Sequence, residues 1–340
     1  MSDAILTTHN LAIGYKTSPK TFHNIASNIS VSLQPGELVC LLGPNGVGKS
    51  TLLRTLSGML PPLKGEVRLL GDDVYKLPPQ ELAKRLSLVL TEQVDVGMLS
   101  AYTLVTLGRY PHTDWWGKLT KQDQAIATWA IEAVGAAHLA QRNLSELSDG
   151  ERQKIMIARA LAQSSIAMLL DEPTAFLDLP RRVEIMQLLR QLVRDTKGAI
   201  LLSTHDLNLA LRLADQVWLL ASNGNLYVGA PEDLVLSGAF ADTFRSEGVE
   251  FNISSGEFSL QRVDRGKIHL VGQGLEAIWT TRALQRIGFH VTQHTTSSNI
   301  FVEVISEPSS VFWRTTNGKA VFIYHSLYEL VKSLDVLIKS

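Results

Sequence analysis

The chain has 340 residues, 45% of them hydrophobic, and its 32 basic and 33 acidic residues give a formal net charge of -1. This length and apolar content predict more than one folded domain, and the lack of a basic excess disfavours sequence-independent binding to nucleic acid. The single cysteine, Cys40, excludes an intrachain disulfide, and no apolar run reaches the ~18 residues of a membrane span. Because the first residues lack the features of a signal peptide, we expect a cytoplasmic protein.

The N-terminal part predicts a β flank followed by a buried strand and a helix. The pattern from Ile5 to Leu33 alternates loosely, as in two strands of an antiparallel sheet. Residues 37–43 form a short apolar run that ends in glycine, which is typical of a central strand. A helix is expected next, and Pro61 and Pro62 should stop it.

The middle of the chain predicts an inserted helical subdomain and then an α/β sheet. Helical periodicity over residues 103–140 is interrupted by an aromatic, turn-rich segment, and we place the subdomain at about 95–163. Strands and helices then alternate, which predicts a mainly parallel sheet with helices on both faces. The expected helices are 149–163, 181–194 and 207–214, and the expected strands are 166–170, 199–203 and 216–221.

The character of the sequence changes beyond about Gly256. A strand over 267–271 leads into a helix over 275–287, and several short β-like runs precede a last helix over 326–338. This segment is long enough for a small core. We therefore predict a first domain over residues 1–255 and a small α/β or α+β domain over 256–340.

Residues 43–50 match the phosphate-binding pattern G-x-x-x-x-G-K-[ST] and lie between the predicted buried strand and the predicted helix. Backbone N–H groups of such a loop hold the α- and β-phosphates of a nucleotide. Lys49 would reach the β- and γ-phosphates, and the Ser50 hydroxyl would bind Mg²⁺. The predicted ATP-binding residues here are Gly43, Pro44, Asn45, Gly46, Val47, Gly48, Lys49, Ser50 and Thr51.

Two acids follow the predicted strand over 166–170. At the carboxyl end of a neighbouring parallel strand, Asp171 can reach the same Mg²⁺. Glu172 is then placed to activate a water molecule as general base. A solvated turn is the alternative, and the nearby phosphate loop makes the catalytic interpretation the stronger one.

Ser148 and Glu151 have the spacing of a capping box at the start of a helix. Together with the other motifs, the segment Leu147, Ser148, Asp149, Gly150 and Glu151 resembles the signature of ATP-binding cassette (ABC) ATPases, usually written LSGGQ. The resemblance extends from about Ala4 to Val235. It implies a P-loop ABC ATPase domain in which ATP joins two copies head to tail, with each signature acting on the nucleotide of the opposite copy.

The same resemblance implies roles for four more residues. Tyr15 resembles the aromatic residue that stacks on adenine, although ordinary strand packing would explain it as well. Gln93 resembles the glutamine that contacts Mg²⁺ and the attacking water, Asp178 resembles the aspartate of the D-loop at the dimer interface, and His205 resembles the histidine that bonds the γ-phosphate. Asp149 and Glu151 replace the usual Gly and Gln of the signature. Asp149 suits the helix dipole but adds negative charge near a polyphosphate.

The segment over 105–112, followed by Trp115 and Trp116, looks like the ATPases that serve iron-siderophore, haem and cobalamin importers. The resemblance implies a membrane permease dimer as partner and, through it, a periplasmic or extracellular binding protein. The subunit would lie on the cytoplasmic side of the inner membrane, with the permease received by the helical subdomain. The alternatives are a soluble ABC ATPase without a transport role and an importer ATPase whose C-terminal domain senses a small ligand.

The C-terminal segment contains two weaker patterns. Residues 272–277 match G-x-G-x-x-[GA] between a predicted strand and a predicted helix, but the segment is too short for a full dinucleotide-binding domain. A tight turn is the preferred interpretation, and a site for a small anion is the other. His290, His294 and His325 lack a recognisable ligand spacing, so surface histidines are preferred to a metal site.

Overall fold

The computed structural model describes residues 4–18, 21–90, 99–175, 177–245, 249–252, 256–260, 264–292, 300–307, 310–317 and 320–337. Two compact units are present: the first comprises Met1–Ser246 and Phe251–Phe258, and the second comprises Glu247–Glu250 and Ser259–Ser340. Within the described residues, no helix is both long and apolar enough to span a membrane.

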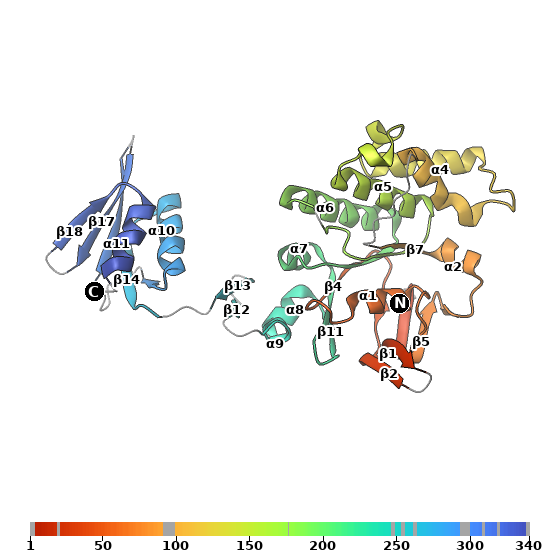
Figure 1. Ribbon diagram of the computed structural model, residues 1–340, viewed down its shortest axis with the longest axis horizontal. Coiled ribbons are helices and arrows are strands. Elements are labelled where there is room, and N and C mark those ends of the chain that lie inside the picture. Colours follow the sequence, from red (N-terminus) through yellow and green to blue (C-terminus); the bar gives the residue numbers. More distant parts are fainter. Residues whose placement is uncertain are drawn as a thin grey trace. The chain divides into compact units, whose positions relative to one another are not determined.

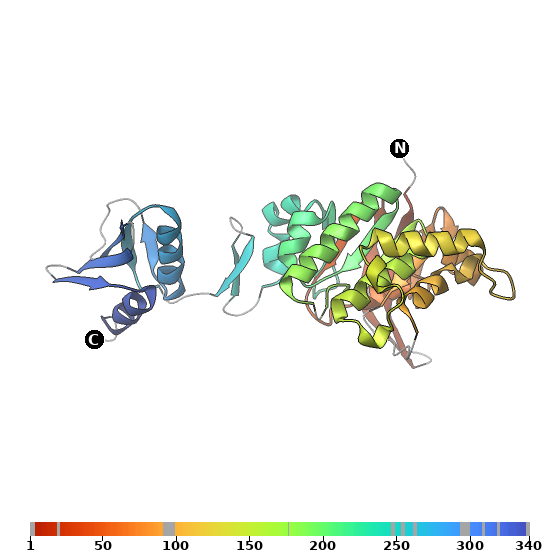
Figure 2. The same cartoon turned by 90° about the horizontal axis from the view of Figure 1, so that it is seen from above.

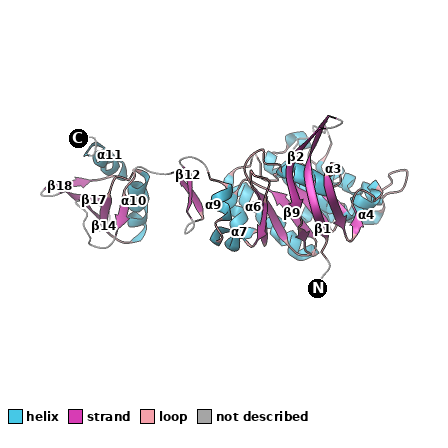
Figure 3. Ribbon diagram, turned by 90° about the horizontal axis from the view of Figure 1, so that it is seen from below, coloured by secondary structure: helices cyan, strands magenta, loops and turns pink. Residues whose placement is uncertain are grey.

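The first unit contains two sheets that differ in strand direction (Figure 1, Figure 3). The smaller sheet has the order β2-β1-β5-β6, with β3 paired to β1, and all its pairs are antiparallel. The larger sheet has the order β11-β10-β4-β9-β8-β7, and only the pair β10-β11 is antiparallel. The strands of the smaller sheet are β1 (Leu6–Ser18), β2 (Thr21–Ile29), β3 (Ser32–Leu33), β5 (Lys64–Leu69) and β6 (Asp72–Asp73). Those of the larger sheet are β4 (Leu38–Leu42), β7 (Leu86–Val89), β8 (Ala167–Leu170), β9 (Ala199–Ser203), β10 (Gln216–Leu220) and β11 (Leu226–Gly229).

Strand β4 separates two apolar cores because its side chains alternate between the faces of the larger sheet. Leu38, Cys40 and Leu42 belong to the core shared with α5 and α6, whereas Val39 and Leu41 belong to the core shared with α1 and the smaller sheet. All five residues are buried. The sequence prediction of a mainly parallel sheet with an antiparallel flank is confirmed.

The helices of the first unit are α1 (Lys49–Leu56), α2 (Pro79–Arg85), α3 (Ala101–Thr106), α4 (Lys121–Ala133), α5 (Asp149–Ala162), α6 (Leu179–Thr196), α7 (Leu207–Leu213), α8 (Pro231–Leu236) and α9 (Ala239–Thr243). The described part of this unit also contains the short 3-10 helices η1 (Leu107–His112), η2 (Ala137–Leu139) and η3 (Leu144–Glu146). Figure 2 shows α4 and α5 lying side by side, and they pack against α3 to form the helical subdomain.

The structure corrects the predicted end of the helix that follows the phosphate loop. Helix α1 ends at Leu56, well before the two prolines that were expected to stop it. Gly58 adopts a left-handed conformation with φ of +79°, and the N–H of Met59 bonds to the carbonyl oxygen of Arg54. A left-handed glycine just beyond the last turn ends a helix because it redirects the chain while satisfying the free carbonyl groups.

A buried ion pair ties the helical subdomain together. Arg109 Nε in η1 lies 2.9 Å from Asp123 Oδ1 in α4, and both side chains are almost fully buried. The Arg109 guanidinium also donates to the carbonyl oxygen of Ala162 at 2.8 Å and to the Ser164 hydroxyl at 2.9 Å. Arg109 therefore joins η1, α4 and the end of α5 from inside the subdomain.

The second unit is a sheet covered on one face by two helices. Its order is β15-β14-β16-β17-β18, with parallel pairs between β14 and both β15 and β16, and antiparallel pairs elsewhere. The Trp313 indole N–H donates to the Thr280 hydroxyl at 2.7 Å, which fixes α10 to the sheet. The elements are β14 (Lys267–Val271), α10 (Gly274–Arg286), β15 (His290–Thr292), β16 (Ile300–Glu307), β17 (Ser310–Asn317), β18 (Ala320–Tyr324) and α11 (Leu327–Leu337). A separate two-stranded pair consists of β12 (Val249–Asn252) and β13 (Glu257–Leu260).

The glycines after β14 fit a tight strand-to-helix turn. A Cβ added at Gly272 would lie 2.9 Å from the Cβ of Val304, so the chain needs a glycine there for close packing. Residue 294 lies outside the described residues, and the His290 side chain is exposed. Within the described ranges, no three His, Cys, Asp or Glu side chains are grouped as a protein-only metal site would require.

Candidate nucleotide site

The loop between β4 and α1 combines close packing with free backbone donors. A Cβ at Gly43 would lie 2.3 Å from the carbonyl oxygen of Leu220, and one at Gly48 would lie 2.4 Å from Cγ2 of Ile25. A larger residue at Gly43 would require a shift of the backbone, and one at Gly48 would displace the Ile25 side chain and strain a backbone with φ of +111°. Helix α1 begins at Lys49 directly after Gly48, which offers no capping side chain, so its first N–H groups are available to an anion.

Lys49 is held inside this loop by the loop's own carbonyl groups. Its Nζ donates to the carbonyl oxygens of Gly43 at 2.9 Å and Pro44 at 3.0 Å, and the side chain is buried. Burial lowers the pKa of Lys49, and the charges of Glu172 and Asp171 oppose that change. The result is an ammonium group poorly supplied with water, which strengthens its attraction for a phosphate.

Ser50 and Asp171 meet at the carboxyl ends of the parallel strands. The Ser50 hydroxyl donates to Asp171 Oδ1 at 3.1 Å, and the Ser203 hydroxyl donates to the same oxygen at 2.7 Å. Because β9 lies between β4 and β8, the segments that follow these strands converge. Ser203 was not among the predicted site residues, since a serine that ends a buried strand has no specific sequence pattern.

These oxygen ligands suit Mg²⁺. A Ser hydroxyl and an Asp carboxylate lie within hydrogen-bonding distance of one another beside the phosphate loop. Mg²⁺ in nucleotide sites binds one or two protein oxygens, the phosphates and several water molecules, so a cluster of many acids is not required. Gln93, the third predicted Mg²⁺ ligand, lies outside the described residues.

Glu172 and His205 form a pair at the edge of the cavity. His205 Nε2 donates to Glu172 Oε1, and the backbone N–H of Glu172 donates to the Ser203 hydroxyl at 2.9 Å. Glu172 has a φ of +49°, in the left-handed region that non-glycine residues rarely occupy. Such strain persists only where surrounding contacts enforce it, and it is common at functional sites.

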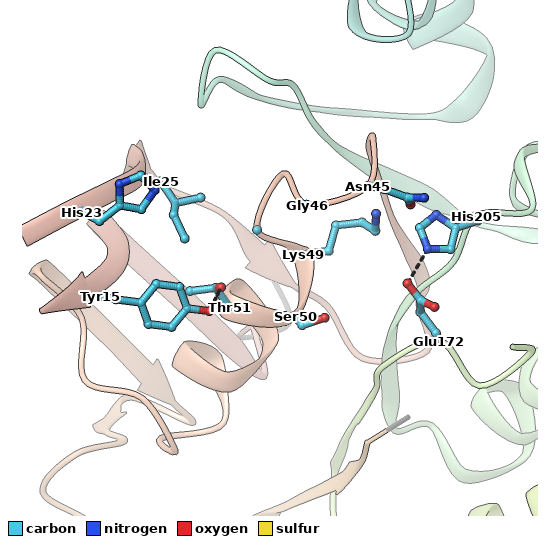
Figure 4. Close-up of a pocket in the computed structure, with 11 residues that line it drawn as sticks. Tyr15, His23, Ile25, Asn45, Gly46, Lys49, Ser50, Thr51, Glu172 and His205 are labelled. Carbon is cyan, nitrogen blue, oxygen red and sulfur yellow. Dashed lines mark hydrogen bonds and ion pairs between the residues drawn. The ribbon is translucent and has the colours of Figure 1, made fainter. Parts of the chain in front are cut away.

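Tyr15, Glu172, His205 and most of the predicted phosphate loop line one cavity of about 530 Å³ (Figure 4), whereas the predicted residues Gly43, Pro44, Val47 and Asp171 are not part of its lining. Lys49 and Ser50 lie between Tyr15 on one side and the pair formed by Glu172 and His205 on the other. The Tyr15 hydroxyl is hydrogen-bonded to the Thr51 hydroxyl, while the Tyr15 ring is partly exposed. The cavity is lined by Tyr15, His23, Ile25, Asn45, Gly46, Gly48, Lys49, Ser50, Thr51, Glu172 and His205.

His23 and Ile25 also line this cavity, although no sequence motif pointed to them. His23 is the cross-strand partner of Tyr15 in the pair β1-β2. The predicted antiparallel flank indicated that a second strand lies beside Tyr15, but only the register of the two strands shows which residues of β2 line the cavity.

The signature segment does not line this cavity. The structure confirms the capping box: Ser148 N–H donates to Glu151 Oε2 at 2.9 Å, and Glu151 N–H donates to Ser148 Oγ at 3.4 Å. The hydrogen bonds from the Ser148 backbone and hydroxyl keep the pKa of Glu151 below its usual range. Leu147 is buried, and Asp149 is exposed at the start of α5.

Asp178 has a structural contact that the sequence analysis did not predict. Its side chain accepts a hydrogen bond from the N–H of Arg181 at 3.0 Å and caps α6, which therefore begins at Leu179, two residues before the predicted start. The Asp178 side chain stays exposed while it caps α6, so it remains accessible to a second copy of the chain.

Comparison with known proteins identifies the family. Residues 26–175 match the ABC transporter model, and residues 265–335 match the model of the iron ABC transporter C-terminal domain. An uncharacterized ABC transporter ATP-binding protein of Methanocaldococcus jannaschii is 40% identical over 76% of this chain and 87% of its own length. The ferric enterobactin transport ATP-binding protein FepC of Escherichia coli is 36% identical over 69% of this chain and 84% of its own length.

A solved structure agrees with this assignment. An inward-facing putative metal-chelate type ABC transporter has a chain that is 29% identical, with a TM-score of 0.61, over 72% of this chain and 89% of that one. The resemblance read from the motifs is thereby confirmed. The chain belongs to the ATP-hydrolysing, ATP-binding proteins of ABC transporters.

Proposed function

We propose that this chain powers the import of a metal chelate through a separate membrane permease. The observation that carries the substrate class is the match of residues 265–335 to the iron ABC transporter C-terminal domain, a segment that lies outside the ABC transporter match over residues 26–175. The similarity to FepC, a ferric enterobactin transport protein, supports the same class. The iron-siderophore, haem and cobalamin chelates all remain within this proposal.

ATP would occupy the cavity of Figure 4, with its adenine against the Tyr15 ring and its phosphates in the loop from Gly43 to Thr51. The backbone N–H groups of this loop and of the first turn of α1 would hold the α- and β-phosphates, and the Lys49 ammonium would reach the β- and γ-phosphates. Ser50, Asp171 and Gln93 would hold Mg²⁺, which neutralises charge that develops on the transferring phosphoryl group.

Glu172 would act as general base towards the attacking water. Its carboxylate is oriented by His205, and its backbone is held by Ser203. His205 would also contact the γ-phosphate, and Gln93 would position the water. The signature from Leu147 to Glu151 would act on the ATP of the second copy, with Asp178 at the same interface, because neither lines the cavity of its own chain.

The permease would dock beside the helical subdomain. A second cavity, of about 590 Å³, lies between α2 and η1, and its lining includes Gln80, Tyr110 and Trp115. Tyr110, Trp115 and Trp116 expose 72%, 95% and 86% of their surface, and exposed aromatic groups of this kind are typical of protein interfaces. The subunit would thus be peripheral to the cytoplasmic face of the inner membrane, and the permease would connect it with a binding protein outside.

The catalytic assignment is tested with Glu172→Gln. We expect this variant to bind ATP and dimerise while its hydrolysis rate falls about 10²–10⁴-fold, the usual contribution of a general base. Glu132→Gln, at an exposed glutamate of α4, is the matched control and should hydrolyse ATP at the parent rate. Near-parental hydrolysis by Glu172→Gln would show that another residue activates the water.

The transport assignment predicts that a permease gene lies beside the gene for this chain, and co-expression of that permease with this chain is the test. We expect the permease to co-purify, and ATP hydrolysis in the reconstituted complex to rise when the binding protein carries its metal chelate. Trp115→Ala should abolish co-purification but leave the basal ATPase intact, whereas Tyr328→Ala, at an aromatic residue of α11 that is 73% exposed, should change neither. ATPase activity that ignores every chelate tested would refute the substrate class.

A further inference from the structure

Strand β18 lies at the border of the sheet in the second unit (Figure 1). It pairs with β17 in an uninterrupted antiparallel register, from Trp313 opposite Tyr324 to Asn317 opposite Ala320. Among the described residues, no strand pairs with its outer edge. Its outward backbone N–H and C=O groups are therefore available to a further strand.

The side chains of β18 do not protect this edge. Val321, Phe322 and Ile323 are consecutive and expose 57%, 45% and 56% of their surface. Border strands of soluble proteins are usually protected by charged residues, proline, a bulge or very short length, and residues 320–324 show none of these. By contrast, the border strand β6 in the first unit consists of Asp72 and Asp73.

Apolar surface is present on both sides of the strand. Phe322 is the cross-strand partner of the buried Thr315, so its side chain lies on the face that α10 and α11 cover. Val321 and Ile323 are the partners of Thr316 and Arg314 and lie on the opposite face. Solvation by water is unfavourable for all three side chains, and a strand added at this edge would cover them together.

We propose that β18 is an interface between two copies of this chain, paired antiparallel across a twofold axis at Phe322. This register is the one in which all five residues of both strands overlap. It places Phe322 opposite the partner's Phe322, Val321 opposite the partner's Ile323, and Ala320 opposite the partner's Tyr324. The second units of the two copies then share one continuous sheet.

A second copy fits this edge better than an unrelated protein does. The strand is complementary to itself in this register, since apolar residues face apolar residues and no like charges meet. The ATP-bridged dimer of the proposed function also holds two copies near each other, so that a weak second contact is reinforced by a high effective concentration. The β18 interface nevertheless needs no nucleotide, which separates its test from that of the ATPase.

Cysteine cross-linking tests the twofold axis directly. In an antiparallel pair, opposite Cα atoms are about 4.5–5.5 Å apart, within the ~4.4–6.8 Å that a disulfide spans. Cys40 is fully buried, so it should contribute no background. Without nucleotide and under mild oxidation, full-length Phe322→Cys should give a disulfide-linked dimer. Leu275→Cys, at a residue of α10 that is 70% exposed, should give none.

A pair of charged variants tests the energetics of the same contact. Val271, Glu303, Arg314 and Ile323 form one cross-strand row. In Ile323→Glu the new carboxylate lies beside Arg314, and in Val271→Lys the new ammonium lies beside Glu303, so each new charge has an opposite neighbour within its own chain. Only Ile323→Glu places a charge in the proposed interface.

Sedimentation of the nucleotide-free proteins should show a concentration-dependent dimer for the parent and for Val271→Lys. The dimer of Ile323→Glu should be at least tenfold weaker. The proposal is overturned if Phe322→Cys fails to cross-link, or if Ile323→Glu associates as strongly as Val271→Lys. ATP-dependent dimerisation in Glu172→Gln would still report on the cassette interface in either case.

Discussion

Replacing Asp123 by alanine should leave the Arg109 guanidinium buried without a counterion. The two side chains expose only 7% and 6% of their surface, and Nε and Oδ1 are 2.9 Å apart. The carboxylate also accepts hydrogen bonds from the backbone N–H of Thr120 at 2.9 Å and from its hydroxyl at 2.6 Å. An arginine cannot escape the resulting penalty by losing its proton, because its pKa is too high.

The expected loss follows from these contacts. Removing one partner of a buried ion pair costs about 3–5 kcal/mol, and losing the capping box at the start of α4 costs about 1 kcal/mol. Since a single carboxylate serves both, the terms overlap, and we expect the free energy of unfolding to fall by about 4 kcal/mol. The Thr120 hydrogen bonds and the Arg109 charge hold the pKa of Asp123 below its usual range. The stabilisation should therefore be present above the ordinary aspartate pKa and disappear as the pH falls through the folded value.

Urea unfolding followed by circular dichroism measures this difference. Thr120→Ala removes the cap but keeps the ion pair, and it should cost about 1 kcal/mol. Asp72→Asn removes the 55% exposed partner of Arg85 and should cost less than about 1 kcal/mol. An Asp123→Ala protein no less stable than Thr120→Ala would refute the role assigned to Arg109.

Three further predictions concern the first unit. Burial raises the pKa of Cys40 to about 12, so iodoacetamide at pH 8 should label this thiol only after unfolding, and rapid labelling of the native protein would contradict the burial. The contribution of the buried neutral thiol to the free energy of unfolding should be complete below a pH of about 8.5 and should decline as the pH rises towards 12. Gly108→Ala should lower the free energy of unfolding in urea by about 1–3 kcal/mol, because the new Cβ would lie 2.2 Å from the carbonyl oxygen of Arg159. Gly150→Ala, whose Cβ would lie 3.6 Å from its nearest neighbour, should lower it far less, and equal losses of stability would argue against a steric cause. Asp149→Gly should not lower the ATPase rate because the Asp149 side chain is exposed, so a large loss of steady-state hydrolysis would reveal a positive role for this acid.

Local patterns predicted much of the chain because their causes are local. The apolar runs that became β4, β8, β9 and β10 are buried on both faces of a sheet, and such strands need no alternation to be recognised. The capping box at α5 was predicted from two residues for the same reason. The end of α1 was predicted too far along the chain because Gly58, which is also a local signal, ends the helix before Pro61 and Pro62.

The order and spacing of the motifs were enough to predict the phosphate loop, the two acids and the family. Tertiary structure decided which residues meet. Ser50, Asp171 and Ser203 converge because β9 lies between β4 and β8, and the order of strands in a sheet is a long-range property that no local spacing carries. Arg109 is polar in the sequence and buried in the fold, since its partners come from α4 and from the end of α5. The free edge of β18 likewise follows from its place at a sheet border, because a strand in the middle of the same sheet has both of its edges paired.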